Sequence, residues 1–174
     1  MRKILFTLFF CLLSTQSFAG ELKVQIEPEK LTEIPNAVQL APNLVAGGTP
    51  SARGLGQAAE QGIRTVIDLR EPKEGTAEEK DHAEAIGVKY VNIPLSVENF
   101  SAIQADQLAE TLKNPATGPV LLNCASGQRA IAVWALHRNL HEGVSAAQAL
   151  EEAKAKGLRK PELTAKLTAL LKES

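Results

Sequence analysis

The stretch Pro119–Ala130, PVLLNCASGQRA, indicates both the fold class and the chemistry of this chain. It opens with an apolar run that is typical of a buried parallel strand. Cys124 follows the strand, and a short loop containing Gly127 leads to a helix expected from Arg129 to His141. A strand that passes through a tight turn into a helix is part of a βαβ unit, so the sequence predicts a covered, mainly parallel sheet.

The same alternation of strand and helix extends in both directions from this stretch. Thr49 is expected to cap the first helix, with Pro50 as its first residue, because a hydroxyl cap followed by proline is a common helix start. The spacing predicts four strands at 43–46, 63–69, 88–93 and 119–123, and helices at 50–61, 76–86, 102–113, 129–141, 145–155 and 161–172. This predicts an α/β fold of three layers, with a mainly parallel central sheet of four to five strands flanked by helices.

Three effects are expected to act on the sulfur of Cys124. The sulfur precedes a helix N-terminus, where the helix dipole and unpaired N–H groups favour an anion. The N–H groups of residues 125–129 can form an anion-binding nest, because Gly127 lets the backbone curl, and Arg129 can hold two anion oxygens. Such surroundings lower the pKa of a cysteine thiol from about 8.5 to roughly 3.5–7.5. We therefore expect a nucleophilic thiolate that attacks an oxyanion substrate; the alternative for Cys124 is a buried structural thiol.

The first nineteen residues have the pattern of a secretory signal peptide. Arg2 and Lys3 precede an apolar run from Ile4 to Leu13, and Ser17-Phe18-Ala19 is a small-x-small cleavage site. An uncleaved N-terminal anchor is the alternative. We expect a signal peptide at 1–19, an N-terminal extension at 20–42, a domain at 43–174 and a periplasmic product. Cys11 would leave with the signal peptide, so Cys124 would be the one cysteine of the mature protein and no intrachain disulfide could form.

Composition narrows the possible partners. The chain has 174 residues, 44% of them hydrophobic and 22% charged, which is an ordinary globular composition for one domain. The formal net charge of -1 shows no basic excess that would favour nucleic acid or an anionic membrane surface. We expect no nucleic-acid partner and no stable membrane insertion once the signal peptide is removed.

Four segments in order resemble the bacterial dual-specificity-phosphatase-like proteins of the beta-lactamase-hydrolase-like phosphatase group. The segments are LVAGGTPS (44–51), TVIDLREP (65–72), AIGVKYVNIPL (85–95) and GPVLLNCASGQRAIAVWAL (118–136). The resemblance implies a cysteine-phosphatase fold with Cys124 as nucleophile and Arg129 as phosphate clamp. It also implies a phosphorylated small molecule or protein as substrate, with residues 125–129 (Ala125, Ser126, Gly127, Gln128 and Arg129) binding the phosphate and with no cofactor or metal.

The chain departs from the pattern of cysteine phosphatases at four places. These enzymes usually have five residues between Cys and Arg, whereas four lie between Cys124 and Arg129, the loop size found in rhodanese-type sulfurtransferases. Asn123 stands where phosphatases generally carry His, and Ala130 where many carry Ser or Thr. The expected general-acid Asp is missing, and Glu98, displaced by one residue, takes its place as candidate acid; the alternative for Glu98 is a solvated loop carboxylate. These departures put catalytic efficiency in doubt.

Other polar residues leave alternatives open. Asp68 and Arg70 end a central strand, and they either line the site or form a structural ion pair. His137 and His141 have the i, i+4 spacing of metal ligands, but no Glu stands between them as in H-E-x-x-H, and we expect a surface or half-buried pair. Three function classes remain: a slow cysteine-dependent phosphatase, which the breadth of the resemblance favours, a sulfurtransferase-like enzyme, and a non-catalytic oxyanion-binding module.

The signal peptide gives the first testable prediction. We expect cleavage after Ala19, so that the exported protein begins at Gly20, because the small residues Ser17 and Ala19 lie three residues and one residue before the cut. Intact-mass measurement of protein recovered from the periplasm checks this. A product that retains residues 1–19, or that is found in the cytoplasm, would contradict it.

Overall fold

A five-stranded sheet forms the centre of the computed structural model, which describes residues 25–173. The strand order is β1-β2-β5-β3-β4. The strands are β1 (Val38–Ala41), β2 (Leu44–Gly47), β3 (Thr65–Asp68), β4 (Lys89–Asn92) and β5 (Val120–Asn123). Strand β1 is antiparallel to β2 at one edge, and the other neighbouring strands are parallel. The predicted α/β class and mainly parallel sheet are confirmed.

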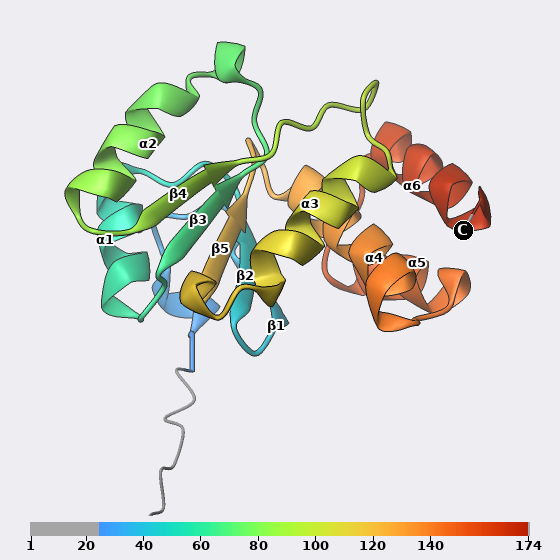
Figure 1. Ribbon diagram of the computed structural model, residues 1–174, viewed down its shortest axis with the longest axis horizontal. Helices are drawn as coiled ribbons and strands as arrows, with labels where there is room; N and C mark the ends of the chain where they lie inside the picture. Colours follow the sequence, from blue (N-terminus) through green and yellow to red (C-terminus); the bar gives the residue numbers. More distant parts are fainter. Residues whose placement is uncertain (1–24, 174) are drawn as a thin grey trace, which may run out of the picture.

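Helices cover both faces of the sheet and complete the three layers (Figure 1). On one face lie α1 (Ala52–Glu60) and α2 (Thr76–Ala85), and on the other α3 (Ala102–Lys113), α4 (Gln128–Glu142), α5 (Ala146–Ala155) and α6 (Pro161–Glu173). Short 3-10 helices are η1 (Pro28–Lys30), η2 (Pro72–Glu74) and η3 (Pro115–Thr117). Each of the six predicted helices is present, with ends within a few residues of those expected.

Strand β5 occupies the middle of the sheet, and its residues alternate between two hydrophobic cores. Val120 and Leu122 face the core beneath α4, whereas Leu121 faces the core beneath α1 and α2. Trp134 of α4 is buried in the first core, as the sequence predicts. Buried β-branched and leucine side chains on both faces are what a covered parallel strand requires. Cys124 therefore directly follows a strand that is paired on both sides and buried on both faces.

The carboxyl ends of the four parallel strands lie in register. Gly47, Asn123, Asp68 and Asn92 pair side by side across β2, β5, β3 and β4. These ends meet at the upper edge of the sheet in Figure 1. In open α/β sheets, this edge is where ligands bind. The loops that follow the four strands are thus brought together around Cys124.

The segment before residue 43 is part of the folded unit, although the sequence predicted an extension there. Ile26, Leu31 and Ile34 are buried in the core beneath α1 and α2, and β1 joins the sheet. The contact is close, because a Cβ at Gly54 of α1 would lie 2.6 Å from the Glu33 carbonyl oxygen. The folded unit therefore begins before residue 43. The expected signal peptide lies outside the described residues.

Helix α1 begins later than the sequence predicted. Ser51, not Thr49, is the N-cap, and its side chain accepts a hydrogen bond from Gly54 N. The Thr49 hydroxyl instead donates to the Cys124 carbonyl oxygen at 3.4 Å. The proline at position 50 precedes the cap because the chain at 47–50 first passes alongside the cysteine loop.

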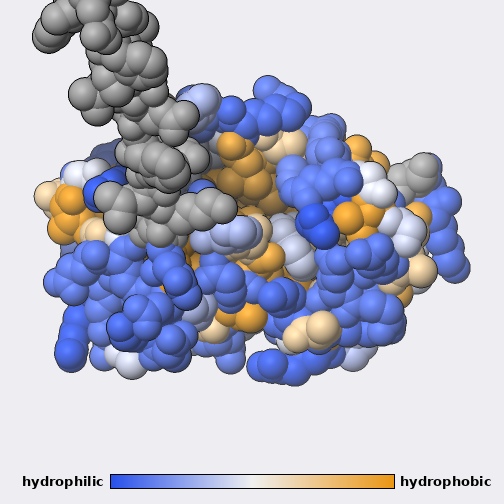
Figure 2. Space-filling view, turned by 90° about the horizontal axis from the view of Figure 1, so that it is seen from below, coloured by the Kyte–Doolittle hydropathy of each residue, from blue (hydrophilic) through white to orange (hydrophobic). Residues whose placement is uncertain are grey.

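The surface opposite the carboxyl edge of the sheet is seen in Figure 2. Viewed from below, it is mostly hydrophilic, with apolar residues gathered towards the middle (Figure 2). Within residues 25–173, no helix combines the length and the apolar character needed to cross a membrane.

Candidate active site

Cys124 lies at the carboxyl end of β5 and is only 1% exposed. Its backbone N–H donates to the Gly47 carbonyl at 3.2 Å, which continues the hydrogen bonding of the sheet for one residue. The N–H of Gly127 donates to the Cys124 Sγ atom at 3.1 Å. The sulfur is thus held at a defined place, with a backbone donor directed at it.

Gly127 makes this turn possible. Its φ of +83° lies in the left-handed region, which side chains other than glycine rarely adopt. A Cβ at this position would also lie 3.4 Å from the Gly47 carbonyl carbon. Gly127 is the N-cap of α4, so the sulfur lies where the helix dipole favours negative charge.

Arg129 is the second residue of α4, and a carboxylate holds it. Its Nη1 and Nη2 atoms donate to the two oxygens of Glu74 at 2.8 and 2.7 Å, and Nη1 also donates to the Leu95 carbonyl at 2.8 Å. The hydrogen bonds from Arg129 hold the pKa of Glu74 well below its usual range, at about 2. The same pairing raises the pKa of Arg129, and the charge of Cys124 adds to that shift. The guanidinium is therefore fixed, charged and close to the sulfur.

A cavity of about 310 Å³ opens onto Cys124 and Arg129. This volume is at the lower end of the range for small-molecule sites. Residues from four segments line it: the cysteine loop, the loop after β3, the loop after β4 and the start of α6. The lining residues are Glu71, Glu74, Ser96, Val97, Cys124, Ala125, Ser126, Gln128, Arg129, Lys160, Glu162 and Leu163. The structure thus brings together all the predicted cysteine-loop residues, with Gly127 directly beneath the sulfur.

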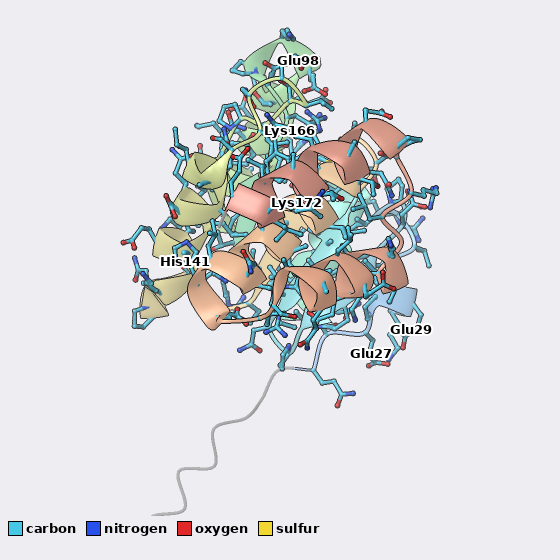
Figure 3. The ribbon with its side chains drawn as sticks, turned by 90° about the vertical axis from the view of Figure 1, so that its right-hand side faces the viewer. Glu27, Glu29, Glu98, His141, Lys166 and Lys172 are labelled. Atoms are coloured by element: carbon cyan, nitrogen blue, oxygen red, sulfur yellow. The ribbon has the colours of Figure 1, made fainter. Side chains whose placement is uncertain are left out.

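Glu98, the predicted general acid, does not line this cavity. Its side chain is exposed at the top of the molecule in Figure 3. A hydrogen bond from Ser96 lowers the pKa of Glu98, and Lys73 adds to the shift. The side chain is therefore ionised at neutral pH, and its role as acid stays a prediction. Glu71 and Glu162 are carboxylates that the cavity does contain.

The side chain of Gln128 anchors a neighbouring loop, whereas the phosphate binding that the sequence predicts concerns its backbone N–H. It is buried, and its amide donates to the Gly157 carbonyl at 2.9 Å. Its Oε1 atom accepts from the N–H groups of Arg159 and Lys160 at 2.8 and 3.1 Å. These bonds hold the loop between α5 and α6 against the cysteine loop and place Lys160 at the cavity. Only the backbone of Gln128 is left to contact an anion.

Local sequence patterns do not predict that Glu74, Lys160 and Glu162 belong to the site. Glu74 is within a Glu71–Glu74 capping box, whose E-x-x-E spacing indicates only a local turn. Lys160 and Glu162 lie more than thirty residues from Cys124 in a charged segment that is typical of a solvated surface. Lys160 and Glu162 reach the cavity because α5 and α6 pack on α4, and local sequence patterns do not predict this packing.

A buried polar network supports the cysteine loop from beneath. Arg70 pairs with Asp68 at 2.9 Å and with Glu79 at 2.6 Å. Asn123, adjacent to Cys124, donates to both oxygens of Glu79 at 2.9 and 3.2 Å, and the Tyr90 hydroxyl donates to Asp68 at 2.8 Å. Asp68 and Arg70 thus form a structural ion pair and do not line the cavity.

The carboxyl of Glu79 has a raised pKa in this network. Burial raises its pKa to about 7, and nearby Asp68 adds to the shift, while Arg70 and Asn123 act in the opposite direction. Two buried carboxylates share one guanidinium, so full ionisation of both is unfavourable. Glu79 is therefore partly protonated near neutral pH.

The two histidines of α4 lie away from the cavity. The rings of His137 and His141 are stacked with centroids 5.3 Å apart. His137 contacts Glu142 at 3.1 Å, and His141 contacts Asp106 at 2.9 Å. In the described part of the chain, no group of three or more potential ligands is arranged to hold a metal ion.

The family model described as "DSP-PTPase phosphatase fused to NAD+ Kinase" matches residues 27–169. The chain belongs to this family. The resemblance to dual-specificity-type cysteine phosphatases is thereby confirmed, and the match begins well before residue 43. A search of curated proteins found no matching sequence.

Solved structures of low sequence identity share the fold. A DUF442 phosphatase from Shewanella putrefaciens CN-32 is 23% identical with a TM-score of 0.67, over 84% of this chain and 98% of that one. TpbA from P. aeruginosa is 19% identical with a TM-score of 0.67, over 86% and 88% of the two chains. The catalytic domain of the PP-IP phosphatase SIW14 from S. cerevisiae is 18% identical with a TM-score of 0.63, over 77% and 85%.

The charge state of Glu79 predicts how stability depends on pH. A carboxyl whose pKa rises from 4.5 to about 7 on folding favours the folded state below pH 4.5, and this stabilisation is lost as the pH rises through 7. The loss is on the order of 3 kcal/mol. Glu79→Gln should remove this dependence on pH. The unfolding free energy from urea titration should then differ less between pH 5 and pH 8 than in the wild type.

The exposed neighbour Glu78 provides the matched control, because it lies on the same helix. Glu78→Gln should keep the wild-type dependence on pH. An equal difference between pH 5 and pH 8 in the wild type and in Glu79→Gln would contradict the assignment of a raised pKa to Glu79.

Proposed function

We propose that this protein is a cysteine-dependent phosphatase that hydrolyses phosphate monoesters through a thiophosphate intermediate on Cys124. The observation that carries the proposal is that a backbone N–H group and a guanidinium both lie at the cavity that contains Cys124. Gly127 N–H is directed at Sγ from below, and the guanidinium of Arg129 lies at the same cavity. Backbone donors and a fixed guanidinium are what a tetrahedral oxyanion requires.

The chemistry proceeds in two displacements. The thiolate of Cys124 forms a bond to phosphorus while the ester P–O bond breaks, and the leaving oxygen takes up a proton. Water then attacks phosphorus, the S–P bond breaks, and phosphate and the thiolate are released. In both steps Arg129 and the N–H groups of the loop stabilise the non-bridging oxygens, because phosphoryl transfer depends mainly on positioning and electrostatics.

Glu74 keeps Arg129 ready for this task. The two-point ion pair fixes the plane of the guanidinium, so little side-chain entropy is lost when the anion binds. The three hydrogen bonds to Glu74 and Leu95 are donated by Nη1 and Nη2. The guanidinium has five N–H donors in all, so donors remain for the substrate.

Proton delivery is the weak part of the site. Glu98 is exposed and ionised at neutral pH, and Ala130 provides no hydroxyl to help the thiolate leave. General acid catalysis is typically worth about 10²–10⁴-fold. We therefore expect slow turnover that favours aryl phosphates, whose leaving groups need little protonation.

The substrate is expected to be a phosphorylated small molecule or protein. Two similar structures support this class: a cysteine-to-serine variant of TpbA in complex with phosphotyrosine, and the PP-IP phosphatase SIW14. The loop of four residues between Cys124 and Arg129 favours a second candidate, sulfur transfer from thiosulfate. The signal-peptide pattern of residues 1–19 supports a periplasmic location for either activity.

Kinetics of two variants test the proposal. Cys124→Ser should abolish hydrolysis of 4-nitrophenyl phosphate, because the hydroxyl is a far weaker nucleophile at neutral pH. Glu98→Gln should slow hydrolysis of an alkyl phosphate more than that of the nitrophenyl ester, if this carboxyl reaches the leaving group. Glu71→Gln and Glu162→Gln, measured in parallel, test the two carboxylates of the cavity that are not paired with Arg129.

Full phosphatase activity in Cys124→Ser would show that the mechanism is wrong. Wild-type protein that transfers sulfur from thiosulfate to cyanide but hydrolyses no phosphate ester would favour the second candidate. Tight binding of phosphate without either activity would indicate an oxyanion-binding module.

A further inference from the structure

The peptide group between Ser126 and Gly127 is held at both of its polar ends. Its N–H, which belongs to Gly127, donates to Cys124 Sγ at 3.1 Å. Its carbonyl, which belongs to Ser126, accepts a hydrogen bond from Asn36 Nδ2 at 3.3 Å. Asn36 lies 90 residues before Ser126, in the segment that precedes β1.

The two contacts are coupled by the geometry of the peptide bond. A trans peptide is planar, and its C=O and N–H point in opposite directions. A carbonyl that is held outwards by Asn36 therefore keeps the Gly127 N–H turned inwards to the sulfur. If the carbonyl rotated inwards, the thiolate would face a carbonyl oxygen in place of a donor.

Local sterics do not prevent such a rotation. Rotation of this peptide changes the φ of Gly127, and glycine adopts positive and negative φ about equally readily. The residue that allows the tight turn thus also leaves the peptide orientation weakly determined. Contacts from outside the loop, namely the bridge between Gly48 and Ser126 and the hydrogen bond from Asn36, then select the orientation that serves the sulfur.

The backbone conformation of Asn36 places its amide at the Ser126 carbonyl. With a φ of +54°, it is the one residue other than glycine that has a left-handed backbone within residues 25–173. Asparagine tolerates this conformation better than most residues, and such strain persists only where the surroundings enforce it. Here the neighbouring Pro35 carbonyl accepts from Gly48 N at 2.6 Å, and Ile34 is buried.

Close packing transmits the position of this segment to the cysteine loop. A Cβ at Gly48 would lie 3.0 Å from Pro35 Cβ and 3.1 Å from the Ala125 carbonyl oxygen. A Cβ at Gly47 would lie 2.5 Å from Ile34 Cγ2. The end of β2 is therefore packed tightly between the segment 34–36 and the cysteine loop.

We propose that Asn36 is a positioning residue that sets the orientation of the Ser126–Gly127 peptide and so the reactivity of Cys124. It acts through the Gly127 N–H and does not touch the substrate. The effect on phosphoryl transfer rests on the proposed function, whereas the effect on thiolate reactivity does not.

Three variants separate the amide from the backbone conformation. Asn36→Gly keeps the left-handed backbone and loses the amide, Asn36→Ala loses both, and Asn36→Asp keeps the shape but turns carboxylate oxygens towards the Ser126 carbonyl. The readouts are the rate of Cys124 alkylation by iodoacetamide against pH and the kcat for 4-nitrophenyl phosphate. Thermal unfolding of each variant is measured in parallel.

We expect the alkylation midpoint of Asn36→Gly to move to higher pH and its kcat to fall about 3- to 10-fold, the effect of one hydrogen bond. Its thermal midpoint should stay close to that of the wild type. Asn36→Asp should lose at least as much Cys124 reactivity and kcat as Asn36→Gly. The exposed Asn43, in the turn between β1 and β2, provides the control, and Asn43→Gly should leave the alkylation profile unchanged.

A wild-type alkylation profile in Asn36→Gly would overturn the proposal, and this reading holds even if Asn36→Ala fails to fold. A shifted profile in a protein that hydrolyses no phosphate ester would support the positioning role and contradict the proposed function alone.

Discussion

The hydrogen bond from Gly127 N–H to the sulfur of Cys124 is the constraint on which the rest of the site depends. Three residues separate Cys124 from the first residue of α4, so the turn that directs this N–H also determines where the helix begins. Arg129 is the second residue of that helix, and its guanidinium reaches the same cavity for that reason. One left-handed glycine thus links the proposed nucleophile, the backbone donors and the proposed anion clamp.

Segments distant in sequence keep this short loop in place. Gly47 and Gly48 pack beneath it, Glu74 holds Arg129 from the loop after β3, and Gln128 ties it to the loop between α5 and α6. Asn123 anchors the end of β5 to the buried carboxylate of Glu79. Because these supports come from the sheet and from packed helices, the site is held in position before any substrate binds.

Much of this arrangement follows from local sequence patterns. The apolar periodicity predicts the strands and helices, and the strand–Cys–loop–Arg–helix unit predicts where Cys124 and Arg129 meet. The rest depends on which loops come together in space. The packing of Ile34 beneath α1, the ion pair of Glu74 with Arg129 and the position of Lys160 join segments far apart in the chain, and the Ser51 cap replaces Thr49 because Thr49 passes beside the cysteine loop.

The central claim is that the sulfur of Cys124 becomes phosphorylated during turnover. Mixing the protein with 4-nitrophenyl phosphate, quenching with acid within the first turnover, and determining the mass of the peptide that contains Cys124 tests this most directly. The account predicts a gain equal to one phosphoryl group on Cys124, formed as fast as the nitrophenol is released. Release of nitrophenol while the Cys124 peptide keeps its original mass at every quench time would contradict it.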